Sequence, residues 1–239
     1  MNAMLPPLQP VDLEANLPVS FYFKANAAVC PFIEPAWRAG CLSFCEVTPD
    51  CHTVQDIHPR LFEQLVPIIE RFRDSRRALA EKHRRLFICH TALMQIPGQL
   101  DADAVKLLTW PNWLNWSLKQ LYTPKEIVFG FIRKNIVEKS SLGVSIPAPP
   151  FHGIIIRSRV VGSDLRFFKG NESLLQAMME AEDDGQNAFS VVPGEIPDIR
   201  DPEALRHADY FNRVRQWGEQ NMIAQGNAQC KQASQDLSS

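Results

Sequence analysis

The chain lacks both a long hydrophobic run and a marked excess of charge. No stretch approaches the roughly 18 uninterrupted apolar residues of a membrane-spanning helix, and residues 1–7 lack the basic flank and apolar core of a signal peptide. The 25 basic and 27 acidic residues give a net charge of -2, so no general attraction to a phosphate backbone or an anionic lipid surface is expected. We therefore expect a cytoplasmic protein that binds neither nucleic acid nor membrane.

The six cysteines include no Cys-x-x-Cys pair, which argues against a zinc ribbon or a thioredoxin-type site. Cys41 and Cys45 lie in a segment with a strand pattern. There, an offset of four places both thiols on one face but roughly 13 Å apart, too far for one metal ion. We expect free thiols.

The common catalytic signatures are absent as well. The sequence contains no Gly-x-Gly-x-x-Gly, Walker loop, His-Glu-x-x-His or Gly-x-Ser-x-Gly motif. The enzyme classes that depend on these motifs are therefore excluded as first interpretations, and any chemistry has to come from less standard patterns.

Two short blocks stand out instead. Cys30 to Gly40 reads Cys-Pro-Phe-Ile-Glu-Pro-Ala-Trp-Arg-Ala-Gly, and Phe151 to Arg159 reads Phe-His-Gly-Ile-Ile-Ile-Arg-Ser-Arg. Each block sets reactive or charged side chains in apolar, proline-rich surroundings, where a purely structural sequence places aliphatic side chains. We look for the function in these two blocks.

A length of 239 residues, 45% of them hydrophobic, favours one domain with extensions. Residues 1–19 contain four prolines and are predicted to form an extended arm. Residues 20–192 should form the domain. Residues 193–239 should contain a linker, a helix that begins at Pro202, and a disordered tail rich in Gln and Ser.

The hydrophobic pattern predicts strands and helices in alternation, with a kink or break at Pro67 inside the longest helix. The predicted strands are 41–47, 85–91, 126–133 and 153–160, and the main helices are 53–83, 113–121 and 173–181. This order predicts an α+β fold with a mixed, largely antiparallel sheet and helices packed on one face. The basic run from Arg71 to Arg85 should be a solvated helix face.

Histidine is the side chain most readily used as a metal ligand or proton carrier near neutral pH. His152 opens an aliphatic strand after a proline-rich loop, which suits a heme ligand at the mouth of an apolar cavity or a hydrogen-bonded strand end. His90 follows a buried strand pattern and is expected in the core. His52 and His58 flank Asp56, which suits either a metal site or an ordinary helix N-terminus.

Arg157 and Arg159 lie two apart in a predicted strand, so they share a face and could clamp a substrate carboxylate. The alternative is an exposed face with acidic partners. His152 would point from the opposite face unless the strand bulges near Gly153. Cys30 could be a thiolate ligand for iron or a buried structural cysteine.

Three tryptophans recur at three-residue spacing around Pro111. Such spacing indicates a packed helix edge or the aromatic wall of a ligand cavity. These residues are Trp110, Trp113 and Trp116.

The block from Cys30 to Gly40, followed by a strand and a long helix, resembles an uncharacterised bacterial domain family with a Cys-Pro-Phe-Val-x-x-Ala-x-Arg block. Together with Ile156-Arg157-Ser158-Arg159, it more distantly resembles the YqcI/YcgG-like proteins. Members of that group include heme-dependent enzymes that oxygenate guanidine or amino nitrogen in small-molecule biosynthesis. The resemblance spans roughly residues 28–192, and this chain reads Cys-Pro where the second group tends to read Pro-Cys.

The resemblance implies an oxidoreductase of antibiotic or secondary-metabolite biosynthesis that binds heme iron and oxygenates an amino acid or amine. Local chemistry then makes His152 the metal ligand and Cys30 a second cofactor-binding residue, with Arg157 and Arg159 holding the substrate. Two alternatives remain. One is a heme-free biosynthetic enzyme that acts on an amino acid or acyl intermediate, with His52, His58 or His90 as acid-base groups. The other is a non-catalytic accessory or binding protein.

Overall fold

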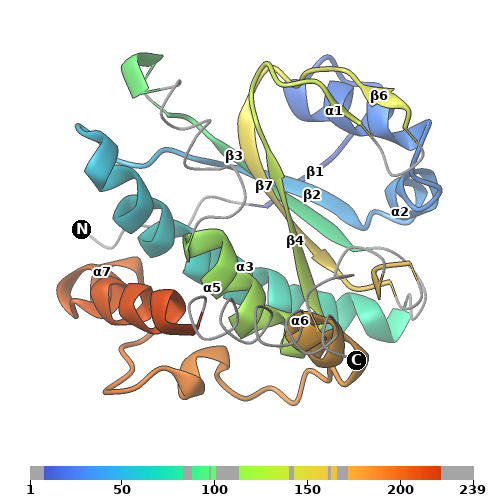
Figure 1. Cartoon of the computed structure of the whole chain (residues 1–239). Coiled ribbons are helices and arrows are strands. Elements are labelled where there is room, and N and C mark those ends of the chain that lie inside the picture. The colour runs from blue at the N-terminus through green and yellow to red at the C-terminus, as the bar shows by residue number, and fades with distance from the viewer. Residues whose placement is uncertain are drawn as a thin grey trace, which may run out of the picture.

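The computed structural model describes residues 8–82, 88–96, 98–100, 113–139, 143–160, 163–165 and 172–221. Within these residues a five-stranded sheet has the order β1-β2-β3-β7-β4 (Figure 1). The strands are β1 (Gln9–Pro10), β2 (Leu42–Val47), β3 (Cys89–Met94), β4 (Ile127–Ile132) and β7 (His152–Ser158). Only β2 and β3 run parallel among these neighbours. The predicted α+β fold with a mixed, largely antiparallel sheet is confirmed.

Helices lie on both sides of this sheet (Figure 1). The predicted helical layer is α3 (Val54–Lys82) and α5 (Trp113–Tyr122). A smaller layer that was not predicted, α1 (Pro18–Ala27) and α2 (Ile33–Arg38), lies on the opposite side. The described residues also include the β5–β6 hairpin (Glu138–Lys139 and Ser145–Ile146), α6 (Glu172–Met179), α7 (Pro202–His207) and short 3-10 turns at Gly98–Leu100, Thr123–Lys125 and Ala188–Val191.

The alternation of side chains along β7 assigns one set to each face of the sheet. Ile154 and Ile156 are fully buried in the main core. Ile155 and Arg157 point from the other face, where a cavity lies between the sheet and the α1–α2 layer. The position of Arg157 in the site therefore follows from the register of one regular strand.

The long helix α3 continues through both Pro59 and Pro67. Of the kink or break predicted at Pro67, the break is therefore excluded. An internal proline costs about 3 kcal/mol. Burial of an apolar side chain contributes about 1.5–3 kcal/mol, and Leu61, Leu65 and Ile69 are among the fully buried side chains of this helix. The buried stripe therefore outweighs the effect of the proline.

Both predicted extensions contribute to the domain. In the predicted arm, β1 pairs with β2, and Val11 is buried in the main core. At the other end, Leu205 and Tyr210 are buried in the same core. The boundaries predicted at residues 19 and 192 therefore do not separate structural units, and residues 1–7 and 222–239 lie outside the described part of the chain.

The helix predicted from Pro202 onward has two parts. Asp201 caps α7, because its carboxylate accepts a hydrogen bond from the Glu203 backbone N–H at 2.9 Å. Asp209, with φ of 47°, separates α7 from a second helical stretch over 210–221. Of the strand predicted over 85–91, residues 89–91 belong to β3, which extends on to Met94, and residues 85–87 lie outside the described part of the chain.

The basic run on α3 is not a solvated face throughout. Arg73 and Arg76 are buried, and both donate hydrogen bonds to the carboxylate of Asp183. The prediction is wrong at these two positions, because Asp183 pairs with both arginines and Glu70 and Glu126 pair with Arg73 and Arg76 respectively. No helix in the described ranges combines the length and apolar character that crossing a membrane requires.

Candidate functional site

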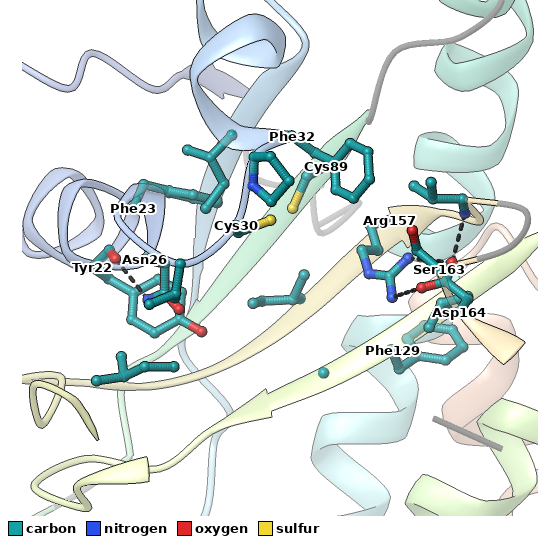
Figure 2. Close-up of a pocket in the computed structure, with 18 of the residues that line it drawn as sticks. Tyr22, Phe23, Asn26, Cys30, Phe32, Cys89, Phe129, Arg157, Ser163 and Asp164 are labelled. Carbon is teal, nitrogen blue, oxygen red and sulfur yellow. Dashed lines mark hydrogen bonds and ion pairs between the residues drawn. The ribbon is translucent and has the colours of Figure 1, made fainter. Parts of the chain in front are cut away.

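A cavity of about 460 Å³ lies between the α1–α2 layer and strands β4 and β7 (Figure 2). Ligand pockets in proteins commonly measure about 300–1,000 Å³. The α1–α2 side of the wall consists of Tyr22, Phe23, Asn26, Val29, Cys30, Pro31, Phe32 and Ile33. The rest consists of Cys89, Lys119, Val128, Phe129, Gly130, Lys139, Ile146, Ile155, Arg157, Val160, Ser163 and Asp164. The two blocks singled out in the sequence therefore meet at one cavity.

Cys30 is held in the cavity wall by the turn that follows α1. Its backbone N–H donates a hydrogen bond to the Asn26 carbonyl at 2.9 Å, and Pro31 follows directly, so the chain turns towards α2. The Asn26 side chain in turn donates to the Tyr22 carbonyl at 2.8 Å. The Cys30 thiol is half-buried and reaches the cavity from this fixed turn.

Arg157 lies at the opposite end of the cavity from Tyr22 and Asn26 (Figure 2). Its guanidinium forms a bidentate pair with Asp164, with N–O distances of 2.8 and 2.6 Å. The Asp164 carboxylate also accepts a hydrogen bond from the Val160 backbone N–H. Because charge-assisted, bidentate bonds are geometrically specific, this pair holds both side chains in place, and its two charges compensate each other.

Arg159 does not join Arg157 at the cavity. It donates to the Met178 carbonyl at 2.6 Å and forms an ion pair with Glu126 at 2.9 Å. The predicted two-arginine clamp is therefore not formed. Each arginine instead pairs with an acidic residue of this protein. Arg157 does so in the cavity wall, and Arg159 does so away from it.

His152 lies on the other face of the sheet from the cavity. β7 pairs with β3 and β4 in a continuous register, so no bulge near Gly153 turns the imidazole round. The side chain is buried, and its Nδ1 accepts a hydrogen bond from the Lys134 backbone N–H at 3.2 Å. The structure thus does not bring His152 together with Cys30 or Arg157, and the residues do not fit a heme held by His152 in this cavity.

His90 belongs to a buried polar cluster on that same face. Its Nε2 is 3.2 Å from Cys45 Sγ, and its Nδ1 is 2.9 Å from Ser43 Oγ. Burial, reinforced by the charge of Arg71, lowers the pKa of His90 to about 3, and burial raises the pKa of Cys45 to about 12. A nucleophilic cysteine has to be a thiolate, so this Cys–His pair is suited to the core rather than to catalysis.

Asp56 serves the N-terminus of α3. Its carboxylate accepts hydrogen bonds from the Thr53 backbone N–H at 2.9 Å and the Thr53 hydroxyl at 2.8 Å. These hydrogen bonds hold the pKa of Asp56 below its usual value. His52 is exposed beside it, and the described residues contain no group of three His, Cys, Asp or Glu side chains that could hold a metal ion.

The sequence interpretation missed Lys119, as well as Lys139 and Asp164, among the cavity residues. Lys119 is the one basic residue of α5 and is half-buried in the cavity wall. Burial lowers its pKa to about 8. The sequence did contain a signal for this residue, because Lys119 is a lysine three residues after Trp116 on an apolar helix. Trp116 itself is buried at a packed helix edge, and Trp110 lies outside the described residues.

Cys30 should be the cavity thiol that reagents reach. It is half-buried, whereas Cys41, Cys45, Cys51 and Cys89 are buried, and burial raises the pKa of Cys89 to about 12. In a Cys230→Ser background, we expect N-ethylmaleimide to modify Cys30 at least about 10-fold faster than these four, because only an accessible thiolate reacts. Peptide mass spectrometry over time measures these rates, and equal rates at Cys30 and Cys89 would contradict the described wall.

The charges around the cavity favour an anionic ligand. Among the residues that the structure describes, three basic side chains, Lys119, Lys139 and Arg157, and one carboxylate, Asp164, belong to a wall that is otherwise mostly apolar. Comparisons with protein-family models, curated proteins and solved structures found no match to this chain. The interpretation of the site therefore rests on its own residues.

Proposed function

We propose that the protein binds a small carboxylic acid with an apolar body, of the amino-acid or acyl class, in the cavity between α1–α2 and β4–β7. The observation that carries this proposal is the excess of positive charge among the described residues of a mostly apolar wall. Ligand sites typically combine a hydrophobic lining with a few placed polar groups that orient the ligand. Phe32 and Ile155 offer contact area to the apolar body.

The Arg157–Asp164 pair is neutral overall, so the two lysines account for the excess charge. Removing an ammonium group from water disfavours its charged form, and this effect lowers the pKa of Lys119. A carboxylate bound nearby would favour the charged form of this ammonium. The cavity is therefore electrostatically complementary to an acid rather than to an amine.

Isothermal titration with phenylpropionate and with its neutral amide, phenylpropionamide, tests this proposal. The two ligands share an apolar body and differ in charge. We expect the acid to bind at least about 10-fold more tightly, which corresponds to roughly 1.4 kcal/mol. Arg159→Gln is the matched control, because Arg159 lies outside the cavity, and it should bind the acid as the wild type does. Equal affinities for the acid and the amide would overturn the proposal.

A heme group held by Cys30 is the second candidate function. The observation that favours it is the position of Cys30 and Pro31 in an apolar cavity wall. A bound heme would supply redox and dioxygen chemistry, and a Cys thiolate is one of its known axial ligands. The visible spectrum of protein expressed with a heme precursor tests this. A Soret band lost in Cys30→Ala and retained in His152→Ala would support it, and no Soret band would reject it.

A further inference from the structure

We propose that Lys119 forms an imine with the carbonyl group of an α-keto acid bound in the cavity. This inference rests on the proposed function, because it assumes that the cavity accepts a carboxylate with an apolar body. It adds a reaction and a narrower ligand class to that function. The acid would carry a ketone on the carbon next to its carboxylate.

The packing of α5 against β4 places Lys119 in the wall of the cavity. Trp116 packs with Val128 in a small buried cluster. Lys119 is three residues further along the same helix, and side chains three apart share a helix face. Val128 in turn lies directly opposite Arg157 in the β4–β7 register. Lys119 and Arg157 therefore lie near the same residue, Val128, and both reach the cavity.

The surroundings of Lys119 suit a nucleophilic amine. Imine-forming lysines are commonly activated by a hydrophobic pocket that disfavours the ammonium form. Lys119 is half-buried in a wall that also contains the apolar Val128 and Ile155, and burial lowers its pKa. Lys139 also lines the cavity but is exposed to solvent, so it lacks the half-buried position of Lys119.

The chemical step is balanced without an oxidant or a metal. The neutral Lys119 Nζ adds to the ketone carbon and forms a carbinolamine. The former carbonyl oxygen then leaves as water and takes up both amine protons, so that a carbon–nitrogen double bond replaces the carbon–oxygen double bond. Because the ketone adjoins the carboxylate, the other two basic residues of the wall, Lys139 and Arg157, would hold the carboxylate while the ketone lies close to the Lys119 amine.

Reductive trapping tests the imine. Protein is incubated with phenylpyruvate and cyanoborohydride, which converts an imine into a stable secondary amine, and the modified peptide is identified by mass spectrometry. We expect one adduct per chain, at Lys119. The adduct should be lost in Lys119→Arg and in Lys119→Met and retained in Lys125→Arg, since Lys125 pairs with Asp184 outside the cavity.

Phenylpropionate, which has no ketone, separates failure of the imine from failure of the proposed function. If phenylpropionate binds but phenylpyruvate leaves no adduct at Lys119, or leaves its adduct at Lys139 or over many lysines, the imine is overturned and the carboxylate site stands. If neither acid binds, both proposals are overturned. Thermal unfolding of both Lys119 variants establishes that the loss of the adduct does not reflect loss of the fold.

Discussion

Replacing Asp183 by Asn should lower the free energy of unfolding by about 3–5 kcal/mol, the cost typical of removing one partner from a buried ion pair. The Asp183 side chain is only 4% exposed, and Arg73 and Arg76 donate to it at 2.9 and 2.6 Å. An Asn side chain keeps the shape but leaves two buried guanidinium groups without this negative charge. Urea unfolding followed by circular dichroism measures the difference.

The neighbouring Asp184 provides a matched control. Its side chain is 40% exposed and pairs with Lys125, and exposed ion pairs contribute little to stability. Asp184→Asn should therefore unfold close to the wild-type midpoint. Similar losses for the two variants would contradict the description of Asp183 as the centre of a buried network.

The same carboxylate should make stability depend on pH. Burial would raise the pKa of Asp183, but hydrogen bonds and charge from Arg73 and Arg76 hold it well below its usual value. In the unfolded chain an aspartate has a pKa of about 4. The stabilisation is therefore fully present above about pH 4 and is lost as the pH falls towards the lower pKa of the folded state. The free energy of unfolding of Asp183→Asn should therefore lack this part of the decrease at low pH.

Replacing Gly130 by Leu should weaken binding of the acid by about 100-fold or more, or roughly 2.7 kcal/mol, because the new side chain occupies the cavity. Gly130 is in β4 and lines the cavity, and an added Cβ would meet Ile155 at 3.6 Å, an ordinary van der Waals contact. Glycine in a strand interior weakens the strand, so replacing it should not destabilise β4. The variant should thus fold normally, and thermal unfolding checks this.

Gly130→Ala is the conservative partner of that variant. It adds only the Cβ, so we expect a much smaller loss of affinity in the same titration with phenylpropionate. A Gly130→Leu protein that folds and binds phenylpropionate as tightly as the wild type would show that the ligand binds elsewhere.

The sequence predicted most of the sheet because β2 and β4 have strong strand patterns. It did not predict α1, whose buried positions include Ser20 and Asn26 as well as Val19 and Phe23. Polar residues on the buried side weaken the apolar periodicity on which such a prediction depends. We therefore predicted a surface arm over residues 1–19, although β1 in this segment belongs to the sheet and Val11 belongs to the core.

The sequence identified individual residues of the candidate site but not which residues the fold brings together there. Cys30 and Arg157 were both singled out, yet only long-range packing of the α1–α2 turn against β7 brings them to one cavity. Strand alternation indicated that His152 would face away from Arg157, and the regular register of β7 is consistent with this. The capture of Arg157 by Asp164 depends on the chain path after β7, for which the sequence pattern offers no signal.

The most direct test of the central claim is a crystal structure of the protein soaked with para-bromophenylpropionate, with anomalous scattering used to locate the bromine. The account predicts a bromine position inside the cavity between α1–α2 and β4–β7, with the carboxylate facing Lys119 or Arg157. A bromine bound elsewhere while this cavity holds no ligand would contradict it.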